Sequence, residues 1–339
     1  MKILVTGGSG FIGSTLIKHI LNTTEDEVIN IDTVTYASSP ITLPSIQHYN
    51  RYTWLRIDIR DADRLKKVFK YHEPDCVIHL AAETHVDNSI SGPEVFMQTN
   101  IMGTFNLLQA TLGYYNSLPD LKKNIFKFHH VSTDEVFGDL LECDTRRFDE
   151  DSPYKPSSPY SASKAASDHL VRAWGRTYGL PIVVSNTTNN YGPFQHPEKL
   201  IPKTIINAIL GKPIIVYGAG NNIRDWIHVE DHAVALLKVL EEGLIGKTYC
   251  IGARTPLPNV VVVTKICKAL DTLWDLPVGT SENLMEFSKD RAGHDARYEI
   301  DPSFAEEDLG WKPTIGFDKG IEDTVQWYIN NRDWWENKV

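Results

Sequence analysis

Apolar and polar positions alternate in blocks along the first half of the chain. The short apolar runs that favour strands are KILVT (2–6), VINID (28–32), TWLRI (53–57), DCVIHLA (75–81), KFHHVS (127–132) and PIVVSN (181–186). Between these runs, apolar residues recur at helical spacing near 11–22, 61–72, 94–116 and 160–178. Strands that alternate with helices in this way predict an α/β fold with a doubly wound parallel (Rossmann) sheet.

The pattern changes after about residue 190. Loops, prolines and shorter elements become more frequent, as in NNYGPFQHPEKLIP (189–202) and GARTPLPN (252–259). The chain then ends in an amphipathic helix over FDKGIEDTVQWYINN (317–331). We therefore predict a Rossmann domain at 1–190 and a smaller C-terminal α/β domain at 191–339, with some of the later chain crossing back to the first sheet.

Composition and charge exclude several classes of protein. Hydrophobic residues make up 42% of the chain and charged residues 23%, as in ordinary globular proteins. The net charge is −10, so nucleic acid and anionic membranes are not expected partners. No run approaches the roughly 18 apolar residues of a membrane span, and the start MKILVTGG lacks the features of a signal peptide. A cytoplasmic location is expected.

Cysteine and histidine spacing gives no sign of a metal site. The chain has 4 cysteines, and none forms a CxxC pair, so neither zinc nor a redox dithiol is predicted. His79, His85 and His129 stand singly near the ends of predicted strands, where we expect structural roles.

The first motif with chemical meaning is TGGSGFIG (6–13), which follows the first predicted strand and begins the first predicted helix. Gly7, Gly10 and Gly13 let the backbone turn sharply and bring its N–H groups to a pyrophosphate at the helix N-terminus. Asp32 ends the second strand, where a carboxylate accepts hydrogen bonds from an adenosine ribose and repels a 2′-phosphate. The three features together predict NAD binding rather than NADP binding.

The second motif is PYSASKAASDHL (159–170), which places Tyr160 and Lys164 four residues apart on one helical face. A neighbouring ammonium is expected to lower the pKa of the phenol and make it a base for an alcohol proton. After a dinucleotide motif, this pair resembles the Tyr-x-x-x-Lys of the short-chain dehydrogenase/reductase superfamily. Thr133 or Ser132 supplies the hydroxyl partner.

The third motif is HHVSTDEVFGD (129–139), in which Asp134 and Glu135 follow a strand directly. Neighbouring residues inside a strand point to opposite faces, so two acids that act on one ligand should lie just past the strand, where the backbone turns. The carboxyl ends of parallel strands are also where open sheets bind ligands. A hydride exchanger needs one base, and two further carboxyl groups suggest elimination of water as a second reaction.

These motifs, together with HLAAETHVDNSI, IRDW and DRAGHD, resemble the dTDP-glucose 4,6-dehydratase family over nearly the whole chain. The resemblance implies oxidation at C4 of the sugar, loss of water across C5–C6 and reduction at C6, as in deoxysugar and rhamnose biosynthesis. It also implies that Tyr160, with Lys164 and Thr133, takes the C4 hydroxyl proton. Glu135 then removes the C5 proton and protonated Asp134 donates to the departing C6 hydroxyl.

The resemblance further implies two sets of binding residues and a homodimer formed through the helices near 94–116 and 160–178. The NAD set is Gly7, Gly10, Phe11, Ile12, Gly13, Asp32, Thr35, Asp58, Ile59, Leu80, Ala81, Ala82, Thr99, Tyr160, Lys164 and Asn190. The set for the nucleotide sugar, dTDP-glucose, is Thr84, Thr133, Asn189, Lys199, Leu200, Tyr217, Arg224, Asn259, Arg291 and His294.

Some positions depart from the family pattern. Ser38-Ser39-Pro40 replaces a common Gly-Asn beside the adenosine, Ala292 replaces a proline, Phe137 replaces a tyrosine, and the segment between 139 and 158 is short. They leave the choice of thymidine or uridine open. The alternatives are a UDP-glucose 4,6-dehydratase and an NAD-dependent 4-epimerase, against which the acid pair argues. A cofactor-sensing protein on this fold is expected to lack Tyr160 or Lys164.

Overall fold

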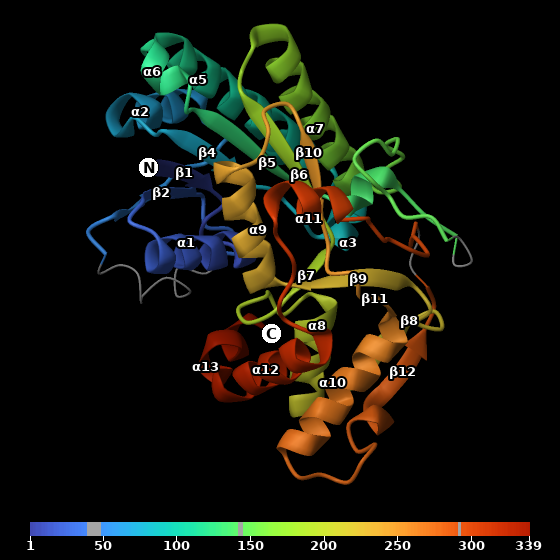
Figure 1. Cartoon of the computed structure of the whole chain (residues 1–339). Coiled ribbons are helices and arrows are strands. Elements are labelled where there is room, and N and C mark those ends of the chain that lie inside the picture. The colour runs from blue at the N-terminus through green and yellow to red at the C-terminus, as the bar shows by residue number, and fades with distance from the viewer. Residues whose placement is uncertain (39–48, 142–144, 291–292) are drawn as a thin grey trace.

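The computed structural model describes residues 1–38, 49–141, 145–290 and 293–339 and has two lobes, with the C-terminus near their junction (Figure 1). Four positions discussed above, Ser39, Pro40, Arg291 and Ala292, lie outside the described residues. Within those ranges no helix is long and apolar enough to cross a membrane.

A seven-stranded sheet forms the first lobe, with the strand order β10-β6-β5-β4-β1-β2-β3. Every neighbouring pair in it is parallel, which confirms the predicted fold class. The strands are β1 (Lys2–Thr6), β2 (Glu27–Asp32), β3 (Tyr52–Arg56), β4 (Cys76–His79), β5 (Lys127–Thr133), β6 (Ile182–Thr187) and β10 (Thr248–Ile251). Six of them follow the predicted apolar runs, whereas β10 comes from the second half of the chain.

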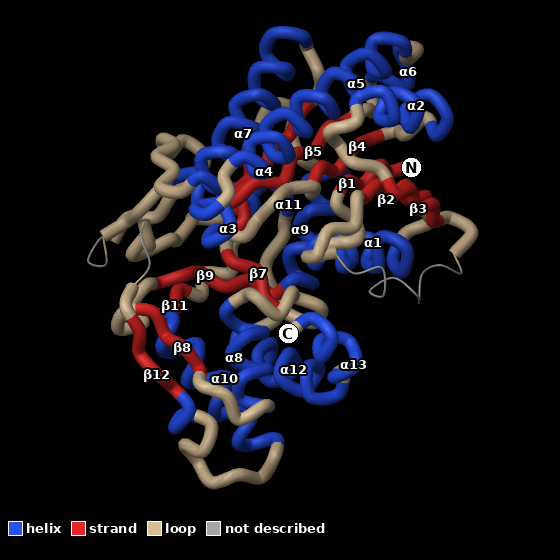
Figure 2. The backbone as a smooth tube through the Cα atoms, turned by 180° about the vertical axis from the view of Figure 1, so that it is seen from behind, coloured by secondary structure: helices blue, strands red, loops and turns tan. Residues whose placement is uncertain are grey.

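Helices cover both faces of this sheet because alternate strand residues point to opposite sides. Leu4 packs with α2 (Ala62–His72), α5 (Thr104–Ser117) and α7 (Pro159–Tyr178). Its neighbours Ile3 and Val5 pack with α1 (Phe11–Thr23) and α9 (Val229–Glu241) on the other face. Figure 2 shows the upper lobe from behind, with α2, α5 and α7 grouped together. Both faces of the sheet are therefore buried, as expected for parallel strands.

The helix predicted over 94–116 is one rod with an interruption. It begins as α4 (Glu94–Phe96), continues as the π-helix η2 (Met97–Gly103) and ends as α5. The Asn100 side chain accepts a hydrogen bond from Glu83 N at 2.8 Å and donates to Glu83 O at 3.0 Å. A Cβ at Gly103 would lie 2.6 Å from Ile59, so this glycine allows the close approach. Wider π turns of this kind are frequent at functional sites.

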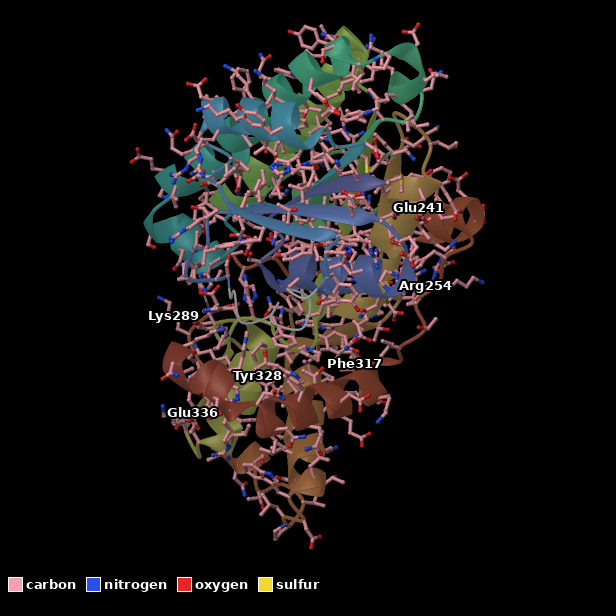
Figure 3. All side chains as sticks on the ribbon, turned by 90° about the vertical axis from the view of Figure 1, so that its left-hand side faces the viewer. Glu241, Arg254, Lys289, Phe317, Tyr328 and Glu336 are labelled. Atoms are coloured by element: carbon pink, nitrogen blue, oxygen red, sulfur yellow. The ribbon has the colours of Figure 1, made fainter. Side chains whose placement is uncertain are left out.

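The second lobe has its own core below the sheet. It contains the strands β7 (Asn189–Tyr191), β9 (Ile223–His228), β11 (Pro256–Pro258), β8 (Ile214–Tyr217) and β12 (Met285–Ser288). Its helices are α8 (Leu200–Ile209), α10 (Asn259–Leu273), α12 (Phe317–Asn330) and α13 (Arg332–Trp335). Phe317 and Tyr328, labelled in Figure 3, belong to the core that joins these helices. The C-terminal helix predicted over 317–331 is α12.

Part of the later chain returns to the first lobe. There α9 packs against α1, β10 extends the sheet, and α11 (Ser303–Leu309) lies against β10 (Figure 1). The remaining short helices are α3 (Val86–Ser91), α6 (Asp120–Lys123), η3 (Asp134–Phe137), η4 (Glu282–Leu284) and η5 (Glu336–Lys338).

Candidate active site

A cavity of about 340 Å³ lies at the carboxyl edge of the sheet, where β1, β2, β4, β5 and β6 end. Every residue predicted for NAD and every residue predicted for catalysis lines it: Gly7, Gly10, Phe11, Ile12, Gly13, Asp32, Thr35, Asp58, Ile59, Leu80, Ala81, Ala82, Thr99, Thr133, Asp134, Glu135, Tyr160, Lys164 and Asn190. Strand ends of a parallel sheet meet at one edge, and this brings residues from distant parts of the sequence together.

The glycine loop between β1 and α1 leaves no room for a side chain at Gly7 or Gly13. A Cβ at Gly13 would stand 2.3 Å from Gly7 O, and one at Gly7 would stand 2.7 Å from Ala81 N. Gly7 also has a φ of +72°, which glycine adopts without strain. At Gly10, the N-cap of α1, no side chain caps the helix. The N–H groups of the first helical turn are thus available to an anion, and the loop fits a pyrophosphate.

Asp32 ends β2 at the wall of the same cavity. Its carboxylate accepts hydrogen bonds from Ser9 N at 3.0 Å, Val34 N at 2.7 Å and the Ser38 hydroxyl at 3.2 Å. Burial raises the pKa of Asp32, while these hydrogen bonds act in the opposite direction. Ser38, one of the departures from the family pattern, therefore helps to orient the carboxylate that is predicted to bind the ribose.

Tyr160 and Lys164 begin α7. The Ser158 hydroxyl accepts from Ser161 N at 3.0 Å and Ser161 Oγ accepts from Ser158 N at 2.9 Å, a capping box that starts the helix at Pro159. Both functional side chains are buried, with 7% and 5% of their surface exposed. Lys164 Nζ donates to Val131 O at 2.9 Å. The cap and this bond fix the pair against β5.

The charge state of Tyr160 differs from the expectation. Burial raises the pKa of its phenol, the negative charge of Glu135 raises it further, and a hydrogen bond with Thr133 opposes them. In the protein alone this pKa is thus raised and not lowered as predicted, because burial and the neighbouring carboxyl groups dominate it. The hydrogen bond also favours Thr133 over Ser132 as the hydroxyl partner.

Asp134 and Glu135 follow β5 as the first residues of η3, so they lie just beyond the strand where the backbone turns. Thr133 caps η3 by accepting from Glu135 N at 3.3 Å, and its hydroxyl donates to Asp134 Oδ1 at 3.2 Å. Asp134 is 2% exposed. Burial and the charge of Glu135 raise the pKa of Asp134 well above its usual range, which favours the protonated carboxyl.

The residues predicted for the sugar nucleotide fall into two groups. Thr84, Asn189 and Lys199 line the same cavity, and Lys199 Nζ donates to Thr84 O at 3.0 Å. The members that do not line it are Leu200, Tyr217, Arg224, Asn259 and His294. Backbone hydrogen bonds from Ile223 N to Ala296 O, and from Asn259 N to Asn222 O, bring most of this second group together beside the β8–β9 connection.

Arg224 is the most buried member of that second group, at 5% exposed. Its guanidinium lies 4.3 Å from the ring centre of Tyr298 and donates to Ile223 O at 2.7 Å and Asp295 O at 2.8 Å. Its positive charge also acts to lower the pKa of Asp134. Arg224 therefore stabilises the second lobe through these contacts, and its positive charge acts on Asp134 of the acid pair.

Two residues that the sequence analysis did not single out stand at this site. Glu198 lines the cavity, and its carboxylate lies 3.6 Å from the imidazole of His85. Tyr298 is 4% exposed, its hydroxyl donates to Asp295, and burial together with the charge of Glu135 raises its pKa. Glu198 precedes Lys199 in a motif already noted, whereas no local pattern marks Tyr298. Across the described ranges, no group of side chains could hold a metal ion.

Comparison with known proteins agrees with this geometry. The family model described as GDP-mannose 4,6 dehydratase matches residues 4–324. The chain is 52% identical to the dTDP-glucose 4,6-dehydratase of Neisseria meningitidis, covering 99% of this chain and 95% of that one. It is also 52% identical to the Haemophilus influenzae enzyme of the same name, covering 98% of each chain.

Solved structures show the same relationship. The dTDP-glucose 4,6-dehydratase of Streptomyces venezuelae, solved with NAD bound, covers 100% of both chains at 39% identity with a TM-score of 0.90. A UDP-glucose 4-epimerase from Thermotoga maritima covers 98% of this chain and 100% of its own at 26% identity, with a TM-score of 0.84. The fold is thus shared with epimerases, but the higher identities are to dehydratases. The chain belongs to the dTDP-glucose 4,6-dehydratase family.

Proposed function

We propose that this chain is an NAD-dependent dTDP-glucose 4,6-dehydratase that forms dTDP-4-keto-6-deoxyglucose, a precursor for deoxysugars such as rhamnose. The observation that carries the proposal is the acid pair of η3, Asp134 and Glu135, in the same cavity as Tyr160 and Lys164. An enzyme that only moves hydride and one proton needs no such pair. The assignments of single residues below are parts of this proposal.

The residues around the glycine loop fit NAD. The α1 N-terminus would hold the pyrophosphate and Asp32 the ribose hydroxyls, and Ile59 and Ala81 would provide apolar walls. Bound there, the nicotinamide supplies a hydride acceptor for C4 and a hydride donor for C6. Tyr160 acts in its phenolate form, which the fixed positive charge of Lys164 on the same helical face would stabilise. In that form it takes the proton of the C4 hydroxyl, assisted by Thr133.

Glu135 and Asp134 then act as base and acid in the elimination of water. Oxidation at C4 acidifies the C5 proton, which Glu135 removes. Asp134 donates a proton to the departing C6 hydroxyl, and its raised pKa supports this role because an acid must carry a proton at neutral pH. After water has left, reduction of the C5–C6 double bond adds a hydride at C6 and a proton at C5, and Glu135 returns that proton. The charge of Glu135 raises the pKa of Asp134 and so favours its protonated form. Two adjacent carboxyl groups can therefore act as one base, Glu135, and one acid, Asp134.

The thymidine nucleotide is proposed because relatives at 52% identity over nearly the whole chain carry that name. One methyl group in a hydrophobic pocket gives only about 1–3 kcal/mol of discrimination. We therefore expect dTDP-glucose to be preferred and UDP-glucose to be used more slowly.

Incubation of the purified protein in deuterated water, without added reductant, tests the proposal. With dTDP-glucose, mass spectrometry should find loss of one water and gain of one deuterium at C5. UDP-glucose should give the same product more slowly, and a faster reaction would reverse the choice of nucleotide. An unchanged chemical formula with galactose configuration would instead identify a 4-epimerase. No turnover of either sugar would favour a cofactor-sensing protein.

We also propose a cytoplasmic homodimer. The three described cysteines are buried and unpaired, as suits a reducing compartment. Helices α5 and α7 lie together on one face of the sheet (Figure 2), and α7 presents partly exposed small apolar residues at helical spacing: Ala162, Ala166, Leu170 and Ala173. Light scattering after size exclusion should give twice the chain mass, and Ala166→Glu should give the monomer. A monomeric wild type would refute the dimer.

A further inference from the structure

Three ionisable residues occupy successive turns of one face of α7. Tyr160, Lys164 and Asp168 are spaced four apart, and all three are buried, with Asp168 fully inaccessible. Residues with this spacing are neighbours on a helix surface. The face they share is turned toward β5, because Lys164 bonds to Val131 O and Asp168 bonds to the adjacent His130. The proposed catalytic pair is therefore continued by a carboxylate one turn further along the helix.

A buried ammonium is costly without an opposite charge. The charge of Lys164 acts on His79 of β4, His130 of β5 and Asp168 of α7. The neighbours of these groups and of Tyr160 are Asp134 and Glu135 on η3, Tyr154 before α7, and Arg172 on α7. Burial lowers the pKa of His79 and His130, so both are neutral near pH 7. Burial raises the pKa values of Asp134 and Tyr160, which favours their neutral forms in the protein alone.

Asp168 is fully buried and held as an anion. Its Oδ1 accepts from His130 Nε2 at 3.0 Å, and its Oδ2 accepts from the Tyr154 hydroxyl at 2.9 Å. Burial alone would raise the pKa of Asp168, but the hydrogen bond from His130, the charge that His130 carries when protonated and, after these, the charge of Lys164 outweigh it and lower that pKa. In return, the charge of Asp168 acts to raise the pKa of Lys164, which burial lowers.

Asn186 links the same carboxylate to the backbone beside the acid pair. Its Nδ2 donates to Thr133 O at 3.0 Å and lies 3.5 Å from Asp168 Oδ2. Asp168 is thus held in place by His130 and Tyr154 and is connected through Asn186 to the end of β5.

We propose that Asp168 is a positioning residue that supplies the counter-charge for Lys164 and keeps its ammonium on the face occupied by Tyr160. The proposal rests on the proposed function, since the Lys164 charge assists catalysis only in that reaction. Asp168 does not line the cavity, so it acts through Lys164 rather than on the sugar.

A double-mutant cycle in melting temperature tests the charge pairing without any turnover. Asp168→Asn keeps the side-chain shape and removes the charge, so the buried Lys164 ammonium is left without its partner and the melting temperature should fall. Lys164→Met in the same chain removes the stranded charge and should restore part of that loss. Melting-temperature losses that simply add would overturn the proposal.

Folding failure is itself informative in this cycle. If Asp168→Asn alone does not fold and the double variant does, the counter-charge role is supported. If the double variant also fails while Lys164→Met folds, Asp168 is required independently of Lys164 and the proposal is wrong. The measurement is unaffected if the substrate assignment fails, so the two proposals can fail separately.

Kinetics provides the second readout. Loss of the Asp168 charge lowers the pKa of Lys164, so the active ammonium form is lost at lower pH. For Asp168→Asn, the alkaline limb of the kcat profile with dTDP-glucose should move down by about one pH unit, a tenfold change, with little change in KM. Tyr154→Phe removes one hydrogen bond to Asp168 but keeps the charge, so its limb should stay in place. The positioning role of Asp168 would be refuted if the alkaline limb of the kcat profile did not move in Asp168→Asn, or if it moved equally in Asp168→Asn and Tyr154→Phe.

Discussion

The two lobes contribute to the candidate site in different ways. All the residues predicted for NAD or for catalysis line one cavity, and except for Asn190 of β7 they belong to the first lobe, where parallel strands end at a common edge. In the second lobe, Tyr217, Arg224 and Asn259 do not line the cavity. The guanidinium of Arg224 instead donates hydrogen bonds to backbone carbonyls and lies over an aromatic ring. The strand ends of the first lobe thus place functional side chains in the cavity, whereas some polar side chains of the second lobe bond within that lobe and stabilise it.

The largest effect should come from the first lobe. Tyr160→Phe removes the proposed acceptor of the C4 proton and keeps the buried ring, so kcat should fall about 10³-fold while the fold is retained. Product formation from dTDP-glucose measures the rate, and circular dichroism checks the fold. A loss below about tenfold would exclude Tyr160 as the base.

Glu135→Gln should separate the two halves of the reaction. The C4 proton still has its acceptor, so reduced nicotinamide should form, but removal of the C5 proton should slow by about 10²-fold or more. Single-turnover absorbance follows the first step and mass spectrometry of the dehydrated sugar follows the second. Equal loss of both steps would contradict the division of roles between Tyr160 and Glu135.

In the second lobe, Arg224→Lys should affect stability more than chemistry. Lysine keeps the positive charge that lowers the pKa of Asp134 but cannot donate to both Ile223 O and Asp295 O while lying over Tyr298. We expect a loss of about 1–3 kcal/mol in the free energy of unfolding, with kcat nearly unchanged. Urea denaturation provides the measurement. If kcat collapses without a loss of stability, Arg224 belongs to the first lobe's chemistry and the contrast between the lobes fails.

The smallest effect concerns pH and stability. Burial in the folded protein raises the pKa of Asp134. The folding stability contributed by the neutral carboxyl is therefore complete below the pKa of the unfolded chain, near 4, and is lost as pH rises through the pKa of the folded protein. The Asp134→Asn side chain cannot ionise, so this variant keeps that stability as pH rises. It should be inactive yet more stable at neutral pH by about 1 kcal/mol, with the difference vanishing in acid.

Melting temperatures across pH measure this difference. Exposed Asp151→Asn serves as the matched control, for which no pH-dependent gain is expected. A loss of stability on replacing Asp134 would show that its carboxyl is not strained by burial.

Much of the fold followed from the sequence, but boundaries and breaks did not. Six strands of the main sheet were predicted because β-branched and apolar runs are a local signal. The interruption at η2 was not, because it depends on Asn100 bonding to Glu83 and on Gly103 approaching Ile59. Some return of the later chain to the first sheet was predicted, but not that β10 makes it, since its partner β6 lies far away in the chain.

The sequence by itself determined the parallel sheet, the glycine loop, the Tyr160–Lys164 spacing and the acid pair after β5, because each is expressed within a few neighbouring residues. Only the tertiary structure decided the protonation of these groups. Burial of Tyr160 beside Glu135 raised a pKa that spacing alone predicted to fall, and burial of Asp134 kept its proton. Burial and long-range charge depend on which segments meet, and that information is spread over the whole chain.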